Sequence, residues 1–209
     1  MSYRVICALG DSITNGYWDE DGLGWFGRFA QKVAKAYPYQ YGFNNLAMDG
    51  DRCTDALNRL RGEALSRQPD ILIIAVGVND IAREGKPDAP MDISEGLRSE
   101  IWGQILQLAK ANIEHVFVIS LHPIIESRYP AEGAANRQLW KSLADIEHYN
   151  KKLEGWCKQA GVNFLNIYDA WNGLRLEDYI YDTAHPSARG HQFIADQVFH
   201  RLGTAGVLL

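Results

Sequence analysis

The chain has 209 residues, of which 46% are hydrophobic and 22% charged, and its formal net charge is −5. This balance is typical of a globular protein with room for a buried core, and the mild negative charge argues against binding to a nucleic-acid backbone. The longest apolar run, at 71–76, is too short to span a bilayer, so no membrane insertion is expected. The 3 cysteines are widely spaced and match neither a disulfide framework nor a zinc site, and no cofactor or metal is expected.

The sequence shows the pattern of neither a signal peptide nor a boundary between domains. The N-terminus has no charged segment followed by a long apolar stretch, which is the pattern of a signal peptide. The sequence as it stands therefore predicts a cytoplasmic protein, although a secreted chain trimmed of its signal would read the same. No repeat or composition shift divides the chain, so residues 1–209 are expected to form a single domain of undetermined oligomeric state.

Short apolar runs alternate with helical patterns along the chain. Runs rich in β-forming residues predict strands at 3–9, 39–46, 71–76, 115–121 and 162–167. Apolar spacing and capping signals predict helices at 25–37, 51–60, 93–108, 139–160 and 187–202, with a cap at Asp51 or Thr54 for the second of them and near Pro186 for the last. Segments 15–24, 82–91 and 124–137 are expected to be loops. The alternation predicts an α/β protein with a five-stranded parallel sheet covered by helices on both faces.

Reactive residue types follow several of these strands, where open parallel sheets bind their ligands. Ser12 follows the first strand, Gly50 the second and Asn79 the third, and Asp182 and His185 precede the last helix. A serine hydroxyl becomes nucleophilic when a histidine accepts its proton and a carboxylate orients the imidazole. The N–H groups of Ser12 and Gly50 and the amide of Asn79 are the donors that an oxyanion needs. Taken singly, each residue is also explained as a turn or capping residue, but together they favour a serine hydrolase.

The same segments resemble the sequence blocks of the GDSL, or SGNH, hydrolases. G-D-S-I-T at 10–14 resembles the first block, Gly50 the second, G-V-N-D at 77–80 the third and D-T-A-H-P at 182–186 the last. The resemblance implies a flavodoxin-like, three-layer α/β/α sandwich with ester-hydrolase activity. It also implies site roles for five residues: Ser12 as nucleophile, His185 as general base and acid, Asp182 as orienting carboxylate, and Ser12, Gly50 and Asn79 as the oxyanion hole.

The substrate is less well defined than the reaction. The loops after the first, third and fourth strands are expected to line the site with apolar, aromatic and cationic side chains, namely Tyr17, Trp18, Ile81, Arg83, Ile124, Arg128 and Tyr129. This mixture predicts a small-molecule ester with a short-chain acyl, aryl or acetylated-sugar group. Asp49 and Asp51, beside Gly50, are expected to face solvent, because an inward carboxylate would oppose the oxyanion.

Other functions remain as alternatives. Thioester hydrolysis and acyl transfer would use the same acyl-enzyme, and a non-catalytic ligand-binding protein would leave the serine and histidine idle. G-L-G-W-F-G at 22–27 spells a dinucleotide fingerprint, but acidic residues precede it where a strand is required. The pairs His122 with Glu126 and Glu147 with His148 lack a third metal ligand.

Overall fold

The sheet at the centre of the molecule is built from the most apolar segments of the chain. The structure is a computed structural model that describes residues 3–133 and 136–208. Five parallel strands form the main sheet in the order β2-β1-β3-β5-β8. They are β1 (Arg4–Gly10), β2 (Tyr41–Ala47), β3 (Ile71–Ala75), β5 (His115–Ile119) and β8 (Asn163–Leu165). This is the flavodoxin-like strand order, in which the connections change direction beside β1, and it confirms the predicted five-stranded parallel sheet.

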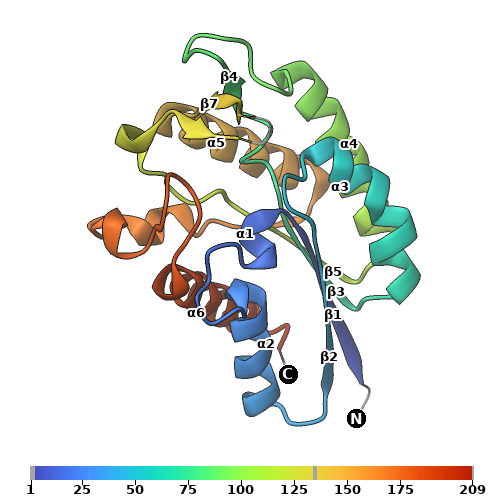
Figure 1. Cartoon of the computed structure of the whole chain (residues 1–209). Coiled ribbons are helices and arrows are strands. Elements are labelled where there is room, and N and C mark those ends of the chain that lie inside the picture. Colours follow the sequence, from blue (N-terminus) through green and yellow to red (C-terminus); the bar gives the residue numbers. More distant parts are fainter. Residues whose placement is uncertain (1–2, 134–135, 209) are drawn as a thin grey trace.

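Helices cover both faces of the sheet and complete a three-layer α/β/α sandwich (Figure 1). One face carries α2 (Gly24–Ala36) and α6 (Ala188–Thr204), and the other carries α3 (Cys53–Arg59), α4 (Glu95–Asn112) and α5 (Leu143–Ala160). Along β3, Leu72 and Ile74 belong to the core under α3, α4 and α5, whereas the alternate side chains belong to the core under α2 and α6. Burial on both faces explains why this strand is apolar throughout. Among the described residues, no helix is long and apolar enough to cross a membrane.

The observed elements differ from the predicted ones in two regions. The helix predicted at 139–160 begins only at Leu143, because β7 (Gln138–Trp140) pairs with β4 (Arg83–Glu84) and β6 (Ala131–Glu132) in a small antiparallel sheet. The apolar residues of β7 happen to match the helical spacing that follows. The predicted caps at Asp51 and Thr54 are wrong, since Arg52 caps α3, whereas α6 begins near Pro186 as predicted, with Ser187 as its cap. Helical turns also continue after α3 as far as Arg67.

The turn after β3 is held by buried polar contacts. Tyr149 of α5 donates its hydroxyl hydrogen to Asp80 at 2.6 Å, and the second carboxylate oxygen of Asp80 accepts the N–H of Cys53 at 2.9 Å. Gly77 has a φ of 134°, and a β-carbon there would lie 2.8 Å from the Tyr149 ring. The turn therefore requires glycine at this position and is held from two helices, which sets the place of Asn79.

Candidate active site

Ser12, Asp182 and His185 lie together at the carboxyl end of the sheet. Ser12 is the first residue of α1 (Ser12–Asn15), a single helical turn that follows β1 (Figure 1). Its Oγ lies 3.0 Å from Nε2 of His185, and Nδ1 of His185 lies 2.7 Å from Oδ2 of Asp182. These distances allow a proton to pass between the serine and the imidazole, while the carboxylate orients the ring from its other side.

Three neighbouring residues shape the turn that presents Ser12. The carboxylate of Asp11 accepts the N–H of Ile13 at 3.0 Å and so caps α1. A β-carbon at Gly10 would overlap the side chain of Thr14, so glycine is needed for the chain to turn this tightly. The serine hydroxyl is thereby held at the end of a rigid central strand.

The carboxylate of Asp182 is surrounded by donors. Oδ1 accepts the backbone N–H groups of Ala184 and His185, both at 2.8 Å. Oδ2 accepts Nδ1–H of His185 and the indole N–H of Trp18, the latter at 3.1 Å. Burial alone would raise the pKa of Asp182, but the hydrogen bond and charge of His185 and the two backbone donors hold it below its ordinary value. Asp182 is therefore ionised at neutral pH.

Gly50 and Asn79 both line one groove, which has a volume of about 620 Å³. Gly50 is exposed and has a φ of 83°, a left-handed conformation that favours glycine. The side-chain amide of Asn79 donates to the carbonyl of Asp51 at 3.0 Å, which joins the turn after β2 to the turn after β3. The two predicted oxyanion residues thus lie in connected turns at one edge of the sheet.

The expectation that Asp51 faces solvent is wrong. It is 5% exposed and forms an ion pair with Arg59, whose charge compensates the buried carboxylate. Burial raises the pKa of Asp51, and the hydrogen bond and charge of Arg59 oppose that rise. Asp49 is exposed, as expected, and accepts a hydrogen bond from Asn15 at 2.9 Å. The negative charge next to Gly50 is therefore neutralised by an arginine rather than turned toward water.

The aromatic and aliphatic residues predicted to line the site separate into two groups. Tyr17 and Trp18 are 43% and 45% exposed, and the ring centroid of Tyr17 lies 4.9 Å from that of His185. Ile81 and Ile124 are fully buried in the core under α3, α4 and α5, so their predicted contact with substrate is wrong. The chain continues inward after β3 and β5 at these points, which the sequence pattern does not reveal.

The two arginines predicted to line the site have structural partners, and the predicted tyrosine is partly buried. Arg83 forms a bidentate ion pair with Asp145, at 2.7 and 3.2 Å. Arg128 donates to the carbonyls of Tyr181 and Asp182, at 3.0 and 2.6 Å, and so fixes the backbone that carries the carboxylate. Tyr129 is partly buried against the core, and that burial raises the pKa of its hydroxyl well above the ordinary value.

The glycine-rich segment at 22–27 offers no empty phosphate site. The carboxylate of Asp19 accepts the N–H groups of Leu23 and Gly24, at 3.1 and 2.7 Å, and pairs with Arg28. An acidic side chain therefore occupies the start of α2, where a nucleotide phosphate would have to bind. This contact argues against the dinucleotide alternative.

The three cysteines are buried, and none of them forms a disulfide bond. Burial raises the pKa of each thiol, to about 11 for Cys7 and about 12 for Cys157. A thiol whose pKa is raised by burial is a poor nucleophile at neutral pH. Within the described part of the chain, no three His, Cys, Asp or Glu side chains gather in a way that could hold a metal ion.

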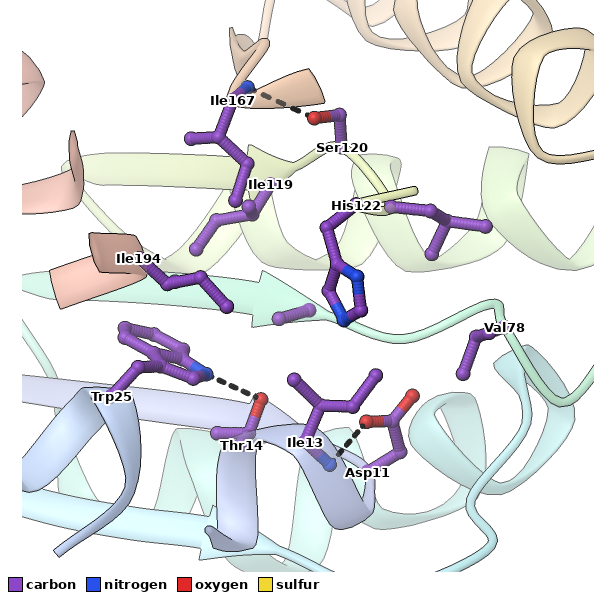
Figure 2. Close-up of a pocket in the computed structure, with 12 residues that line it drawn as sticks. Asp11, Ile13, Thr14, Trp25, Val78, Ile119, Ser120, His122, Ile167 and Ile194 are labelled. Carbon is purple, nitrogen blue, oxygen red and sulfur yellow. Dashed lines mark hydrogen bonds between the residues drawn. The ribbon is translucent and has the colours of Figure 1, made fainter. Parts of the chain in front are cut away.

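A buried cavity lies behind the serine turn (Figure 2). Its volume of about 30 Å³ is enough for one or two water molecules. The ring of His122 points into the cavity, on the side of Asp11 and Ile13. Nδ1 of His122 donates to the carbonyl of Pro123 at 2.7 Å, and Nε2 has no partner among the described residues. Burial lowers the pKa of His122 to about 4 and raises the pKa of Asp11 to about 7.

Lys141 brings a positive charge to the same region. It stands between β7 and α5, and its ammonium group interacts electrostatically with Asp11 and Asp182. Burial lowers its pKa from the ordinary value. The sequence predicted neither Lys141 nor His122 as a neighbour of the site, because both come from segments that reach it only in the folded chain.

The chain is similar to known proteins over nearly its whole length. The sequence profile of the GDSL-like Lipase/Acylhydrolase family matches residues 8–193. The uncharacterized protein YpmR of Bacillus subtilis (strain 168) is 30% identical over 220 residues, which cover 97% of this chain and 83% of that protein.

Solved structures share the fold at much lower identity. The acetylxylan esterase Axe2 from Geobacillus stearothermophilus superposes with a TM-score of 0.77 at 17% identity, over 97% of this chain and 95% of that one. LAE5, an alpha/beta hydrolase enzyme from the metagenome of Lake Arreo, Spain, superposes with a TM-score of 0.76 at 16% identity, over 100% of this chain and 98% of that one.

The raised pKa of Asp11 predicts a pH-dependent stability that Asp11→Asn removes. The folded protein holds the Asp11 proton to about pH 7, whereas an unfolded carboxyl releases it near 3.9. The stabilisation is therefore complete below about pH 4 and is lost as the pH rises through about 7. Asparagine keeps the capping oxygen and does not titrate. Between pH 4 and pH 8 the free energy of unfolding of the parent should fall relative to that of Asp11→Asn. The expected fall is on the order of 4 kcal/mol, since each unit of pKa shift corresponds to about 1.4 kcal/mol.

Urea unfolding of both proteins at pH 4, 6 and 8 measures this difference. The titrating groups that do not interact with Asp11 contribute equally to both chains and cancel, so the measured difference reports Asp11 together with its electrostatic partners His185, Lys141 and Asp80. Parallel stability curves would show that Asp11 is ionised in the folded protein throughout this range.

Proposed function

Because the chain belongs to the GDSL-like lipase/acylhydrolase family and is therefore a hydrolase of ester bonds, we propose that it cleaves carboxylic esters through an acyl-enzyme on Ser12. The observation that carries this proposal is the 3.0 Å contact between Ser12 Oγ and His185 Nε2. A hydroxyl becomes an effective nucleophile when a base within hydrogen-bonding distance takes its proton. His185 meets that condition, and the ionised Asp182 behind it would stabilise the imidazolium that forms.

The proposed reaction has two steps. In the first, Nε2 of His185 takes the hydroxyl proton while Oγ of Ser12 attacks the ester carbonyl carbon. The tetrahedral intermediate then expels the alcohol, which leaves with the proton from His185. In the second step water attacks the acyl-enzyme, His185 takes its proton, and the same proton returns to Oγ as the carboxylic acid departs.

Three donors are proposed to stabilise the tetrahedral oxyanion. Ser12 is the first residue of α1, so its N–H has no partner within the helix. Gly50 would supply a second backbone N–H from the turn after β2. Asn79 has two amide hydrogens, and the bond to the carbonyl of Asp51 uses one of them. The second is then available for the oxyanion.

The groove beside Gly50 and Asn79 favours a short acyl group or an acetylated sugar over a long acyl chain. Charged side chains border it in pairs, with Arg52 2.9 Å from Asp92 and Arg137 3.5 Å from Glu84. An alkyl chain laid against them would strip water from the charges, which is unfavourable. A hydroxyl-rich group would instead replace that water with hydrogen bonds. The structural relative Axe2 is an acetylxylan esterase, which supports acetylated carbohydrate as the leading candidate.

Removal of the nucleophile is the first test of this proposal. Ser12→Ala should abolish hydrolysis of p-nitrophenyl acetate, because it removes the hydroxyl that contacts Nε2 of His185 and would form the acyl-enzyme. His185→Ala should be nearly as inactive, and the double variant little worse, because the two side chains act as a unit. Hydrolysis at the parent rate by Ser12→Ala, purified away from host esterases, would refute the proposed mechanism.

The role of Asn79 predicts a separation of the kinetic constants. Asn79→Ala should lower kcat by about 10²–10³ and leave KM almost unchanged, because an oxyanion donor acts mainly in the transition state. Asn58→Ala, on the exposed surface of α3, is a matched control and should behave as the parent does. A rise in KM with unchanged kcat would place Asn79 in ground-state substrate binding instead.

The charged groove predicts a preference for short and hydrophilic acyl esters. Across p-nitrophenyl esters, kcat/KM should be highest for acetate and fall as the acyl chain lengthens, since longer chains must desolvate charged pairs. The enzyme should also remove acetyl groups from acetylated xylo-oligosaccharides, which is measured as the release of acetate. A maximum at octanoate or longer would contradict the assignment of this groove to a polar substrate.

A further inference from the structure

The loop that follows α1 is fixed against the proposed triad. The carboxylate of Asp19 accepts the N–H groups of Asp21, Leu23 and Gly24 and is paired with Arg28 at 2.7 Å, which locks the loop from inside. On α6, the buried imidazole of His191 lies 3.3 Å from the carbonyl of Tyr17 and donates to it through Nε2–H. The two exposed aromatic residues of this loop are therefore held in place by buried polar contacts.

Trp18 adopts a conformation that an unconstrained residue avoids. Its φ is 61°, in the left-handed region that is unfavourable for residues other than glycine. The indole stacks on Tyr181 with ring centroids 4.8 Å apart. Because the residue stays 45% exposed, burial of apolar surface does not explain why this strain is retained. The conformation does direct the indole N–H to Oδ2 of Asp182, at 3.1 Å.

We propose that Trp18 is a positioning residue that acts through Asp182 and sets the pH at which His185 becomes able to accept the serine proton. Oδ2 of Asp182 receives both the indole N–H and the imidazole Nδ1–H. Two donors on one oxygen weaken each other, because each withdraws electron density from the shared acceptor. With the indole in place, Asp182 therefore holds the imidazolium less tightly, and His185 releases its proton at a lower pH.

Other charged or titratable groups face the same pair. Those that interact electrostatically with His185 or Asp182 are Asp11 at the start of α1, His122 after β5, Tyr129 in the following loop, Lys141 before α5 and His191 on α6. Arg128 also donates to the carbonyl of Asp182, and the ring of Tyr17 lies against that of His185. None of them is altered when Trp18 alone is replaced. A comparison of the parent with a Trp18 variant therefore isolates the effect of the indole N–H.

Trp18→Phe tests the proposal, because phenylalanine keeps an aromatic ring at this position and removes the indole N–H donor. Titration of the His185 ring, followed by NMR in the resting protein, should move to higher pH by about 0.5–1 unit, as expected for loss of a donor to a partly exposed carboxylate. The acid limb of the kcat/KM profile should move by the same amount, with little change in the plateau rate. Trp156→Phe on α5, whose ring contacts Tyr149, is the matched control and should move neither.

An unchanged His185 titration in Trp18→Phe would overturn the proposal, whatever happens to kcat. A lower plateau rate with an unmoved acid limb would assign Trp18 to packing or substrate contact. The kinetic arm rests on the proposed esterase function, but the NMR arm needs no substrate. Failure of Ser12→Ala to abolish hydrolysis would therefore refute the proposed function and leave the result for Trp18 standing.

Discussion

The site depends on the tight turn between β1 and α1. β1 is the strand from which the sheet extends in both directions, and all strands of that sheet end at the same edge. Gly10 lets the chain reverse without a clash, and Asp11 caps the single helical turn that begins with Ser12. The hydroxyl is thus attached to the most constrained part of the core. Its 3.0 Å distance to His185 then requires only that the segment before α6 be brought to the same edge.

The protein contains several buried or partly buried carboxylates near this edge, and each is accommodated differently. Asp80 is bound by a tyrosine hydroxyl and a backbone N–H, and Asp51 is paired with an arginine. Asp182 is ionised because it accepts hydrogen bonds at both oxygens, whereas burial favours the neutral form of Asp11. In the proposed mechanism the negative charge of Asp182 lies behind His185, where it stabilises the imidazolium.

The loop at 16–23 connects the serine turn to the carboxylate of Asp182. It leaves α1 directly after the serine turn and reaches Asp182, so one short segment contacts both His185 and Asp182 of the proposed triad. Its own fixation by Asp19 also explains the glycine-rich sequence at 22–27. Gly24 has a φ of 59°, and a β-carbon there would lie 2.9 Å from the backbone of Gly16. Gly24 therefore serves close packing of the loop, whereas Gly22 has a left-handed φ of 68° with no atom near its missing β-carbon, and the match of this segment to a nucleotide fingerprint is coincidental.

The sequence by itself determined the order of the main elements, the parallel sheet and the identity of the residues at its carboxyl edge. It could do so because buried parallel strands are continuously apolar, and because strand ends in such a sheet meet at one edge whatever the loops do. Only the tertiary structure decided that Asp51 is buried against Arg59, that Ile81 and Ile124 point into the core, and that Trp18 binds Asp182. Each of these contacts joins residues from different elements, and no local spacing encodes which side chain a folded loop turns inward. The small β4-β7-β6 sheet was unpredictable for a related reason, since strands of two or three residues are too short to show a period and form through pairing alone.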